Sequence, residues 1–191
     1  MLEIKFNPKK LAKLNNPDRL LSQNPDVFWP LLELKNPEVI VDIGCGTGFF
    51  SVEFFKRAPG SKVFGLDLSP IMIDWIKENR PEYQSKKLVP LEMPEDSLPL
   101  EAQTADLAVM INLHHELHNP DGLLVDILRV LKPGAKLLII DWKAKPTEAG
   151  PPLEIRAKVP VVIEQLKLAG FAETIEHPVF DDFFMVTGTK A

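Results

Sequence analysis

The stretch Val39–Phe50 reads VIVDIGCGTGFF, and the rest of the chain is organised around it. Its first five residues are apolar and β-branched except for one carboxylate, Asp42, which is typical of a strand buried on both faces of a parallel sheet. Glycines then stand at positions 44, 46 and 48, where a tight turn lets the backbone approach another group closely. After Thr47 apolar residues recur at helical spacing. The pattern predicts a strand, a glycine turn and a helix whose first N–H groups point at a ligand.

The next predicted strand supports a nucleotide-like ligand. Lys62–Leu66 reads KVFGL and leads to Asp67, an acidic residue placed to accept hydrogen bonds from a ribose diol. Glycine turns of this kind also occur in dinucleotide-binding proteins, with the spacing G-x-G-x-x-G. Here the spacing is G-x-G-x-G, preceded by Asp42, and it resembles motif I of the class I methyltransferases that depend on S-adenosylmethionine (SAM). The segment ILRVLKPGAKLLIID, from Ile127 to Asp141, is a second part of the resemblance.

The resemblance implies an α/β fold, a doubly wound Rossmann-like sheet with helices on both faces. Its seven strands would be mostly parallel, in the order 3-2-1-4-5-7-6, with the last strand antiparallel. Independent support comes from the third predicted strand, Leu88–Leu91, because Pro90 cannot donate to a central ladder and so favours an edge strand. We expect residues 1–191 to form a single domain. Within it, residues 1–36 would supply a loose arm up to about residue 16, and then helices that either cap the site or only cover the sheet. Asn24-Pro25-Asp26 predicts the start of one of these helices, Ser69-Pro70 is expected to cap a helix over Ile71–Asn79, and Lys132-Pro133-Gly134 is expected to close the helix that begins at Asn119.

The same resemblance implies a set of contacts to the cofactor, with S-adenosylhomocysteine as the product. Asp42 would serve the amino group of SAM and Asp67 the ribose, while the glycine turn approaches the methionine part. For adenine the family uses an acid in the loop after the third strand. Here Pro94 stands at that position, so Glu95 or its backbone is favoured, with Glu92 and Asp96 as neighbours. The full cofactor-binding set is Asp42, Gly44, Cys45, Gly46, Gly48, Asp67, Leu68, Met93, Glu95 and Asn112.

Candidate catalytic residues follow the fourth predicted strand, Asp106–Asn112. His114 and His115 are the candidate bases, together with Glu116, because an imidazole is the natural base near neutral pH. The alternative is that each histidine only packs beneath the cofactor. His114, Glu116 and His118 alternate as metal ligands do in a strand, but the helix signal at Asn119 places them in a turn, so no metal site is expected.

The composition limits the partners and the location that can be expected of the protein. The chain has 191 residues, a net charge of −5, a single cysteine and 18 prolines. The negative charge argues against a standing nucleic-acid partner, and no apolar run is long enough to span a membrane. One cysteine, with no signal-peptide pattern at the N-terminus, makes the cytoplasm the expected location. A homodimer is a further expectation.

The predicted function is methyl transfer from SAM to a small acceptor by in-line displacement. The Asn/Asp-Pro-Pro-aromatic motif of amino-methylating enzymes is missing, since Asn112-Leu113-His114-His115 stands in its place. The sequence after the fourth strand resembles the branch that includes ubiquinone and menaquinone biosynthesis methyltransferases. Two alternatives stay open, an NAD(P)-dependent oxidoreductase and a SAM-binding protein without catalysis. Tyr83, the only tyrosine, and Lys87 have the Tyr-x-x-x-Lys spacing that would favour the oxidoreductase, but the pair is misplaced, since it stands just before the third predicted strand.

Overall fold

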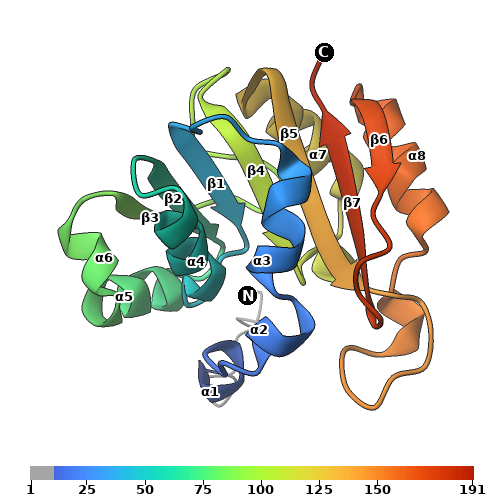
Figure 1. Cartoon of the computed structure of the whole chain (residues 1–191), viewed down its shortest axis with the longest axis horizontal. Coiled ribbons are helices and arrows are strands. Elements are labelled where there is room, and N and C mark those ends of the chain that lie inside the picture. Colours follow the sequence, from blue (N-terminus) through green and yellow to red (C-terminus); the bar gives the residue numbers. More distant parts are fainter. Residues whose placement is uncertain (1–10) are drawn as a thin grey trace.

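The computed structural model describes residues 11–191, and all of its strands belong to one sheet (Figure 1). The order is β3-β2-β1-β4-β5-β7-β6, as predicted. Strands β1 to β5 pair in parallel, whereas β7 runs antiparallel to both β5 and β6. The bounds are β1 Val39–Ile43, β2 Lys62–Asp67, β3 Leu88–Glu92, β4 Ala105–Ile111, β5 Leu131–Trp142, β6 Ala172–Glu176 and β7 Phe183–Thr189.

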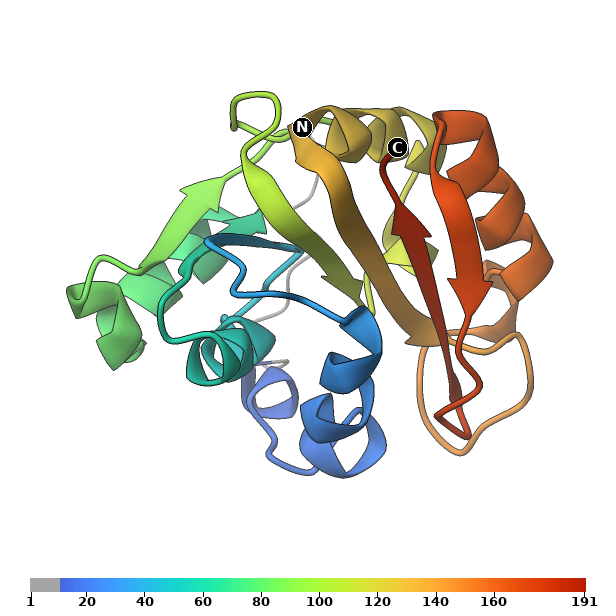
Figure 2. The same cartoon turned by 45° about the horizontal axis from the view of Figure 1, so that its top comes forward.

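Helices cover both faces of the sheet (Figures 1 and 2). Successive residues of a strand point to opposite faces, so Ile40 packs with Phe28 and Phe54 on one face, and Val41 with Leu124 on the other. The first face carries α3 (Pro25–Phe28), α4 (Phe49–Arg57) and α5 (Pro70–Asn79), and the second carries α7 (Pro120–Val130) and α8 (Val159–Ala169). The short α6 (Pro81–Gln84) lies beside β3. The predicted doubly wound architecture is confirmed.

Two short helices, α1 (Leu11–Leu14) and α2 (Arg19–Ser22), precede α3. Residues 1–10 of the predicted loose arm lie outside the described part of the chain, and Leu11–Leu14 is helical rather than loose. The predicted start of α3 is confirmed, because the Asn24 side chain accepts a hydrogen bond from the N–H of Asp26 at 2.9 Å. Beyond Phe28 the chain tightens into a 3₁₀ helix over Trp29–Leu32. No helix among residues 11–191 has the length and apolar character needed to cross a bilayer.

Two local predictions were wrong. Lys132–Gly134 was expected to end the preceding helix, but α7 ends at Val130 and the segment belongs to β5. The reason is pairing, since Leu131 lies opposite Ala105 of β4 and the N–H of Gly134 donates to the carbonyl of Lys190. Ser69 was expected to cap α5 through its side chain. Its hydroxyl makes no such bond and is buried without a partner.

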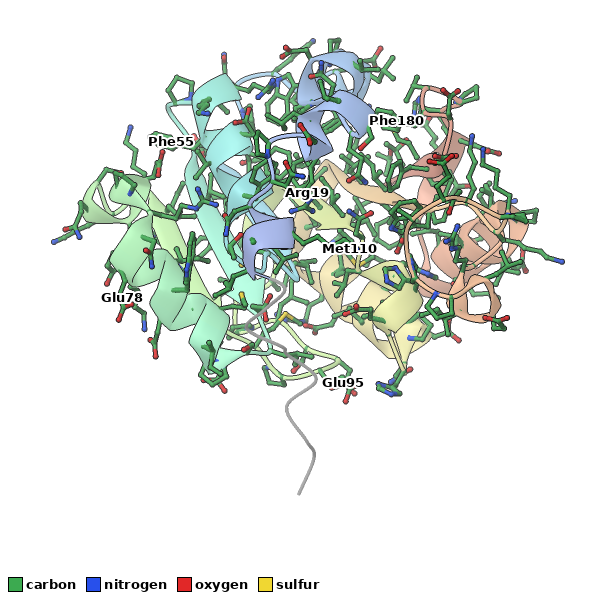
Figure 3. The ribbon with its side chains drawn as sticks, turned by 90° about the horizontal axis from the view of Figure 1, so that it is seen from below. Arg19, Phe55, Glu78, Glu95, Met110 and Phe180 are labelled. Carbon is green, nitrogen blue, oxygen red and sulfur yellow. The ribbon has the colours of Figure 1, made fainter. Side chains whose placement is uncertain are left out.

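The carboxyl ends of β1, β2, β4 and β5 meet at one edge of the sheet, which Figure 3 shows from below. Helices α1 and α2 cross this edge, and the loop of residues 143–152 follows β5 at the same edge (Figures 1 and 3). The edge of a doubly wound sheet at which the strand order reverses is where ligands bind. The candidate residues therefore have to be located there.

Candidate active site

The glycine turn has the backbone that its sequence predicts. Gly44, Gly46 and Gly48 have φ angles of +67°, +55° and +66°, which residues with a side chain rarely adopt. A methyl group on Gly44 would lie 2.7 Å from Leu113 Cδ1, while the nearest described atom to one on Gly46 is Leu14 Cδ1 of α1, at 3.7 Å. The turn thus needs glycine for its conformation and, at Gly44, also for close approach.

Asp67 ends β2 and binds the turn directly. Its Oδ2 accepts from the N–H of Gly46 at 2.7 Å, and its Oδ1 accepts from the N–H of Ser69 at 2.9 Å. Burial raises the pKa of this carboxyl, and the two backbone bonds oppose that rise. Each carboxylate oxygen has a second lone pair, so Asp67 can hold the turn and still accept a ribose hydroxyl. Its neighbour Leu68 is 52% exposed.

Asp42 lies beneath the turn in a buried cluster of polar groups. Its Oδ2 accepts a 2.6 Å hydrogen bond from Ser51 Oγ of α4. Burial raises the pKa of Asp42 to about 7, although the bond from Ser51 and the charge of Arg19 both lower it. The Cys45 thiol is also buried, with Sγ 3.1 Å from where a Cβ on Gly65 would lie, so its pKa is well above the usual value. Cys45 can therefore meet a ligand only through its backbone.

Arg19 of α2 is a site residue that the sequence analysis missed. Its guanidinium lies 5.0 Å from the ring centroid of Phe49 and 4.7 Å from that of Phe50, at the start of α4. Burial lowers its pKa to about 10, and the charge of Asp42 opposes that change. Figure 3 shows Arg19 near the middle of the carboxyl edge. The sequence alone could not identify Arg19 as a site residue, because no local pattern links α2 to the glycine turn some twenty-five residues later in the chain.

Asn112, which was predicted to contact the cofactor, has its side chain engaged elsewhere. Its Oδ1 accepts from Gln23 Nε2 at 3.0 Å, and its Nδ2 donates to Gln23 Oε1 at 2.9 Å. Gln23 is only 1% exposed, so this reciprocal pair joins the N-terminal helices to the end of β4. The backbone of Asn112 has a φ of +57° and donates its N–H to the carbonyl of Ile140. Contact between the Asn112 amide and a cofactor would require Gln23 to give up this pairing.

The loop after β3 is tied to the site at two points. The N–H of Met93 donates to the carbonyl of Asp67 at 3.0 Å, and the Met93 side chain is buried in the core. Glu95 is exposed, and its Oε1 lies 2.5 Å from His118 Nδ1 (Glu95 is at the rim in Figure 3). The adenine role of Met93 and Glu95 stays a prediction.

The structure separates the two candidate bases. His114 is buried, with Nε2 3.0 Å from Gln165 Oε1 of α8, and burial lowers its pKa. His115 instead places Nδ1 2.7 Å from Asp141 Oδ1 at the end of β5, while its backbone N–H donates to Asp141 Oδ2 at 3.0 Å. Its other ring nitrogen, Nε2, lies 3.7 Å from Glu116 Oε1. Within residues 11–191, no cluster of His, Cys, Asp or Glu is arranged to hold a metal ion.

Asp141 was recognised from the sequence only as a residue at the strand edge. In the structure its carboxylate also accepts from the N–H of Trp142 at 2.7 Å, so it receives three hydrogen bonds in all. A carboxylate that only accepts requires the proton of His115 on Nδ1. This leaves a lone pair on His115 Nε2, which is the state a general base needs.

These residues test the fit of a SAM site. SAM carries a sulfonium and an ammonium; the Asp67 carboxylate accepts from the N–H of Gly46 in the glycine turn, and Asp42, which is bonded to Ser51 of α4, lies just ahead of the turn in β1. The open backbone at Gly46 and the acidic end of β2 suit an adenosine moiety. Together with the strand order, they define the chain as a protein of the class I SAM-dependent methyltransferase type.

Comparisons with known proteins agree with this class. The methyltransferase domain family matches residues 41–139. A SAM-dependent methyltransferase from Aquifex aeolicus has a structure that superposes with a TM-score of 0.86, at 30% identity, covering 98% of this chain and 100% of that one. The chain belongs to this family, and the prediction of SAM as cofactor is confirmed. A phosphoethanolamine N-methyltransferase from Haemonchus contortus, solved with SAM, shares the fold at 15% identity and a TM-score of 0.74.

Curated relatives are more specific. A demethylmenaquinone methyltransferase from Thermus thermophilus is 28% identical over 137 residues, which are 69% of this chain and 62% of that protein. A ubiquinone/menaquinone biosynthesis C-methyltransferase from Syntrophotalea carbinolica is 31% identical over 142 residues, covering 68% of this chain and 56% of that protein. The chain thus spans about three-fifths of the length of these relatives.

Proposed function

We propose that the protein transfers a methyl group from SAM to a hydroxyl or an acidic carbon of a small acceptor, with His115 as the general base. The observation that carries this proposal is the pairing of His115 with Asp141 at the carboxyl ends of β4 and β5. When bound, SAM would supply a methyl group whose carbon the aligned acceptor attacks in line, so that the carbon–sulfur bond breaks and S-adenosylhomocysteine leaves. The demethylmenaquinone methyltransferases among the relatives favour an aromatic diol as the acceptor.

The roles of the chain's own residues follow from the contacts described. Asp42 and Arg19 face the amino-acid end of SAM with one charge of each sign, which matches its ammonium and carboxylate. Asp67 and the glycine turn hold the ribose and the adjoining chain. Asp141 orients His115, whose Nε2 takes the proton from the acceptor. Alignment of the acceptor with the methyl group and exclusion of water would supply the remaining rate enhancement.

The test compares His115→Gln with the matched control His177→Gln. His177 directly follows β6, two strands from β5 in the sheet, and its Nε2 lies 2.9 Å from Thr187 Oγ1 of β7. With 1,4-dihydroxynaphthalene (kept reduced) as acceptor, His115→Gln should lower kcat by about 10²–10⁴-fold, as loss of a general base does. Its SAM affinity should stay within about twofold of that of the unmodified protein, and His177→Gln should retain full activity.

The pH profile separates a base from a packing residue. A phenolic hydroxyl ionises by itself near pH 10, so the deficit of His115→Gln should shrink as the pH approaches that value. A deficit that stays constant from pH 7 to 10, or an unchanged kcat at pH 7, would contradict the role of His115. The single-domain organisation, the cytoplasmic location, the lack of a nucleic-acid partner and the homodimer stay predictions.

A further inference from the structure

The loop of residues 143–152 is folded around one buried guanidinium, that of Arg156. Arg156 Nη1 donates to the carbonyl of Lys145 at 2.9 Å and to Thr147 Oγ1 at 2.8 Å. Its Nε and Nη2 both donate to the carbonyl of Pro151, at 3.0 and 2.8 Å, and Nη2 also reaches the carbonyl of Ala149 at 3.2 Å. The segment contains no helix or strand, so several of its backbone carbonyls accept their hydrogen bonds from the Arg156 side chain instead. Arg156 is only 9% exposed.

Two further contacts fix this loop against the end of β5. The Arg156 guanidinium lies 5.1 Å from the ring centroid of Trp142, which in turn packs on Phe183 at 4.3 Å. Gly150 has a φ of +112°, and a methyl group there would lie 2.8 Å from Arg156 Nη2 and 2.9 Å from Trp142 Cδ2. The loop can close over Trp142 only with glycine at this position and with an arginine beneath it.

An open, solvent-facing hollow of about 700 Å³ lies against the loop, lined by Trp142, Pro146, Thr147, Glu148, Ala149 and Asp182. The loop begins two residues beyond Asp141, the carboxylate that holds His115. Figures 1 and 3 show the loop at the carboxyl edge, to one side of α2. The hollow is thus on the β5 side of the site, whereas the glycine turn and Asp67 are on the β1–β2 side.

The charges of the lining limit what the hollow can hold. Glu148 and Asp182 are both acidic, and Lys145 Nζ is paired with Asp182 Oδ1 at 2.9 Å. Lys143 Nζ is bonded to the carbonyl of Phe180. Among residues 11–191, therefore, no unpaired cation lines the hollow to receive a phosphate or carboxylate, while Trp142 and Pro146 offer apolar contact.

We propose that this hollow is the subsite for the uncharged body of the acceptor, and that Arg156 is the positioning residue that builds it. The inference rests on the proposed function, because it places the acceptor of that reaction. It excludes acceptors whose body carries a phosphate. It also gives Arg156, fifteen positions beyond Asp141, a role in selecting the acceptor rather than in binding SAM.

Two variants disturb the loop from opposite sides. Arg156→Lys keeps the positive charge but cannot form the fork of hydrogen bonds, and Gly150→Ala introduces a clash with both Arg156 and Trp142. Arg57→Lys, on the outer side of α4 beside Glu53, is the matched control. For each protein we would measure SAM affinity, KM and kcat for 1,4-dihydroxynaphthalene, and hydrogen exchange of the amides in residues 143–152.

The expected result is a rise of at least fivefold in the acceptor KM of Arg156→Lys and Gly150→Ala, with SAM affinity unchanged within twofold and faster exchange in the loop. Arg57→Lys should show none of these changes. The diol should also slow loop exchange in the unmodified protein. Faster loop exchange with an unchanged KM, or an Arg156→Lys loop that exchanges at the normal rate, would overturn the proposal. Loop protection by the diol in a protein that transfers no methyl group would refute the proposed function and leave the subsite standing.

Discussion

Asp42→Asn should stabilise the SAM-free protein above neutral pH, although it removes a charge from the site. The carboxyl has an ordinary pKa of 3.8 and a folded-state pKa of about 7, mainly because of burial. Between these values the folded state binds more protons than the unfolded chain, so stability falls as the pH rises through this window and is level above it. The difference of roughly three pH units between the two pKa values corresponds to a loss of at most about 4 kcal/mol in the free energy of unfolding.

Asparagine escapes this cost because it stays neutral and its Oδ1 can still accept from Ser51 Oγ. Allowing about half of the limit for relaxation and for the lost attraction to Arg19, we expect a gain of about 2 kcal/mol at pH 8. That corresponds to a rise in Tm of about 4–8 °C for a chain of this size. At pH 4.5 the folded-state group is neutral in both proteins and only the unfolded carboxyl, with its ordinary pKa of 3.8, is ionised, so the Tm difference should shrink to less than about half of its value at pH 8.

Thermal unfolding at the two pH values is the assay, with Asp106→Asn as the control. Asp106 accepts from the N–H groups of Glu38 and Val39 and pairs with Lys132, and its pKa is lowered, mostly by these partners, against burial. Its stabilisation is present at high pH and lost as the pH falls through the folded pKa, so this variant should be less stable at pH 8. An Asp42→Asn protein with a lower Tm at pH 8 would refute the reasoning. Its SAM affinity should fall at least tenfold, because the charge facing the ammonium is gone.

Three other substitutions test contacts that shape the site. Asp67→Ala should weaken SAM binding at least tenfold in calorimetry while the far-ultraviolet circular dichroism stays unchanged; equal affinity would remove the ribose assignment. Gly44→Ala should lower the free energy of unfolding by about 1–3 kcal/mol in urea titrations, through its positive φ and the clash with Leu113, and a neutral effect would contradict the close approach. Gln23→Ala should cost about 1–3 kcal/mol because the half-buried Asn112 amide is left without its partner, and a double variant with Asn112→Ala should cost less than the sum of the two.

The sheet could be predicted because its signals are local. Val39–Ile43, the glycine turn and Asp67 indicate a strand, a turn and a second strand by their own residues and spacing, whereas the strand order came from the family resemblance, supported by Pro90, which favours an edge strand. The error at Lys132–Gly134 shows where such reasoning ends. Pro133 and Gly134 are ordinary helix-ending residues, yet long-range pairing with β4 and with Lys190 continues β5 through them.

The chemistry of the site was less predictable, because it depends on contacts between distant segments. His114 and His115 are adjacent and equivalent in the sequence, and only the placement of Gln165 and Asp141 separates them. The pairing of Gln23 with Asn112 spans 89 residues. When such a partner is unknown, a polar residue at the end of a strand is taken to be available to a ligand. Asn112 was interpreted in this way.

The most direct test of the central claim is transfer of a labelled methyl group from SAM to 1,4-dihydroxynaphthalene, measured for the unmodified protein and for His115→Gln at pH 7 and pH 10. The account predicts a methylated product with the unmodified protein, a loss of at least a hundredfold in kcat for His115→Gln at pH 7, and partial recovery at pH 10. Equal rates for the two proteins at pH 7 would contradict the role of His115. SAM binding without methyl transfer to this diol or to any other small hydroxyl or carbon acceptor would contradict the proposed reaction itself.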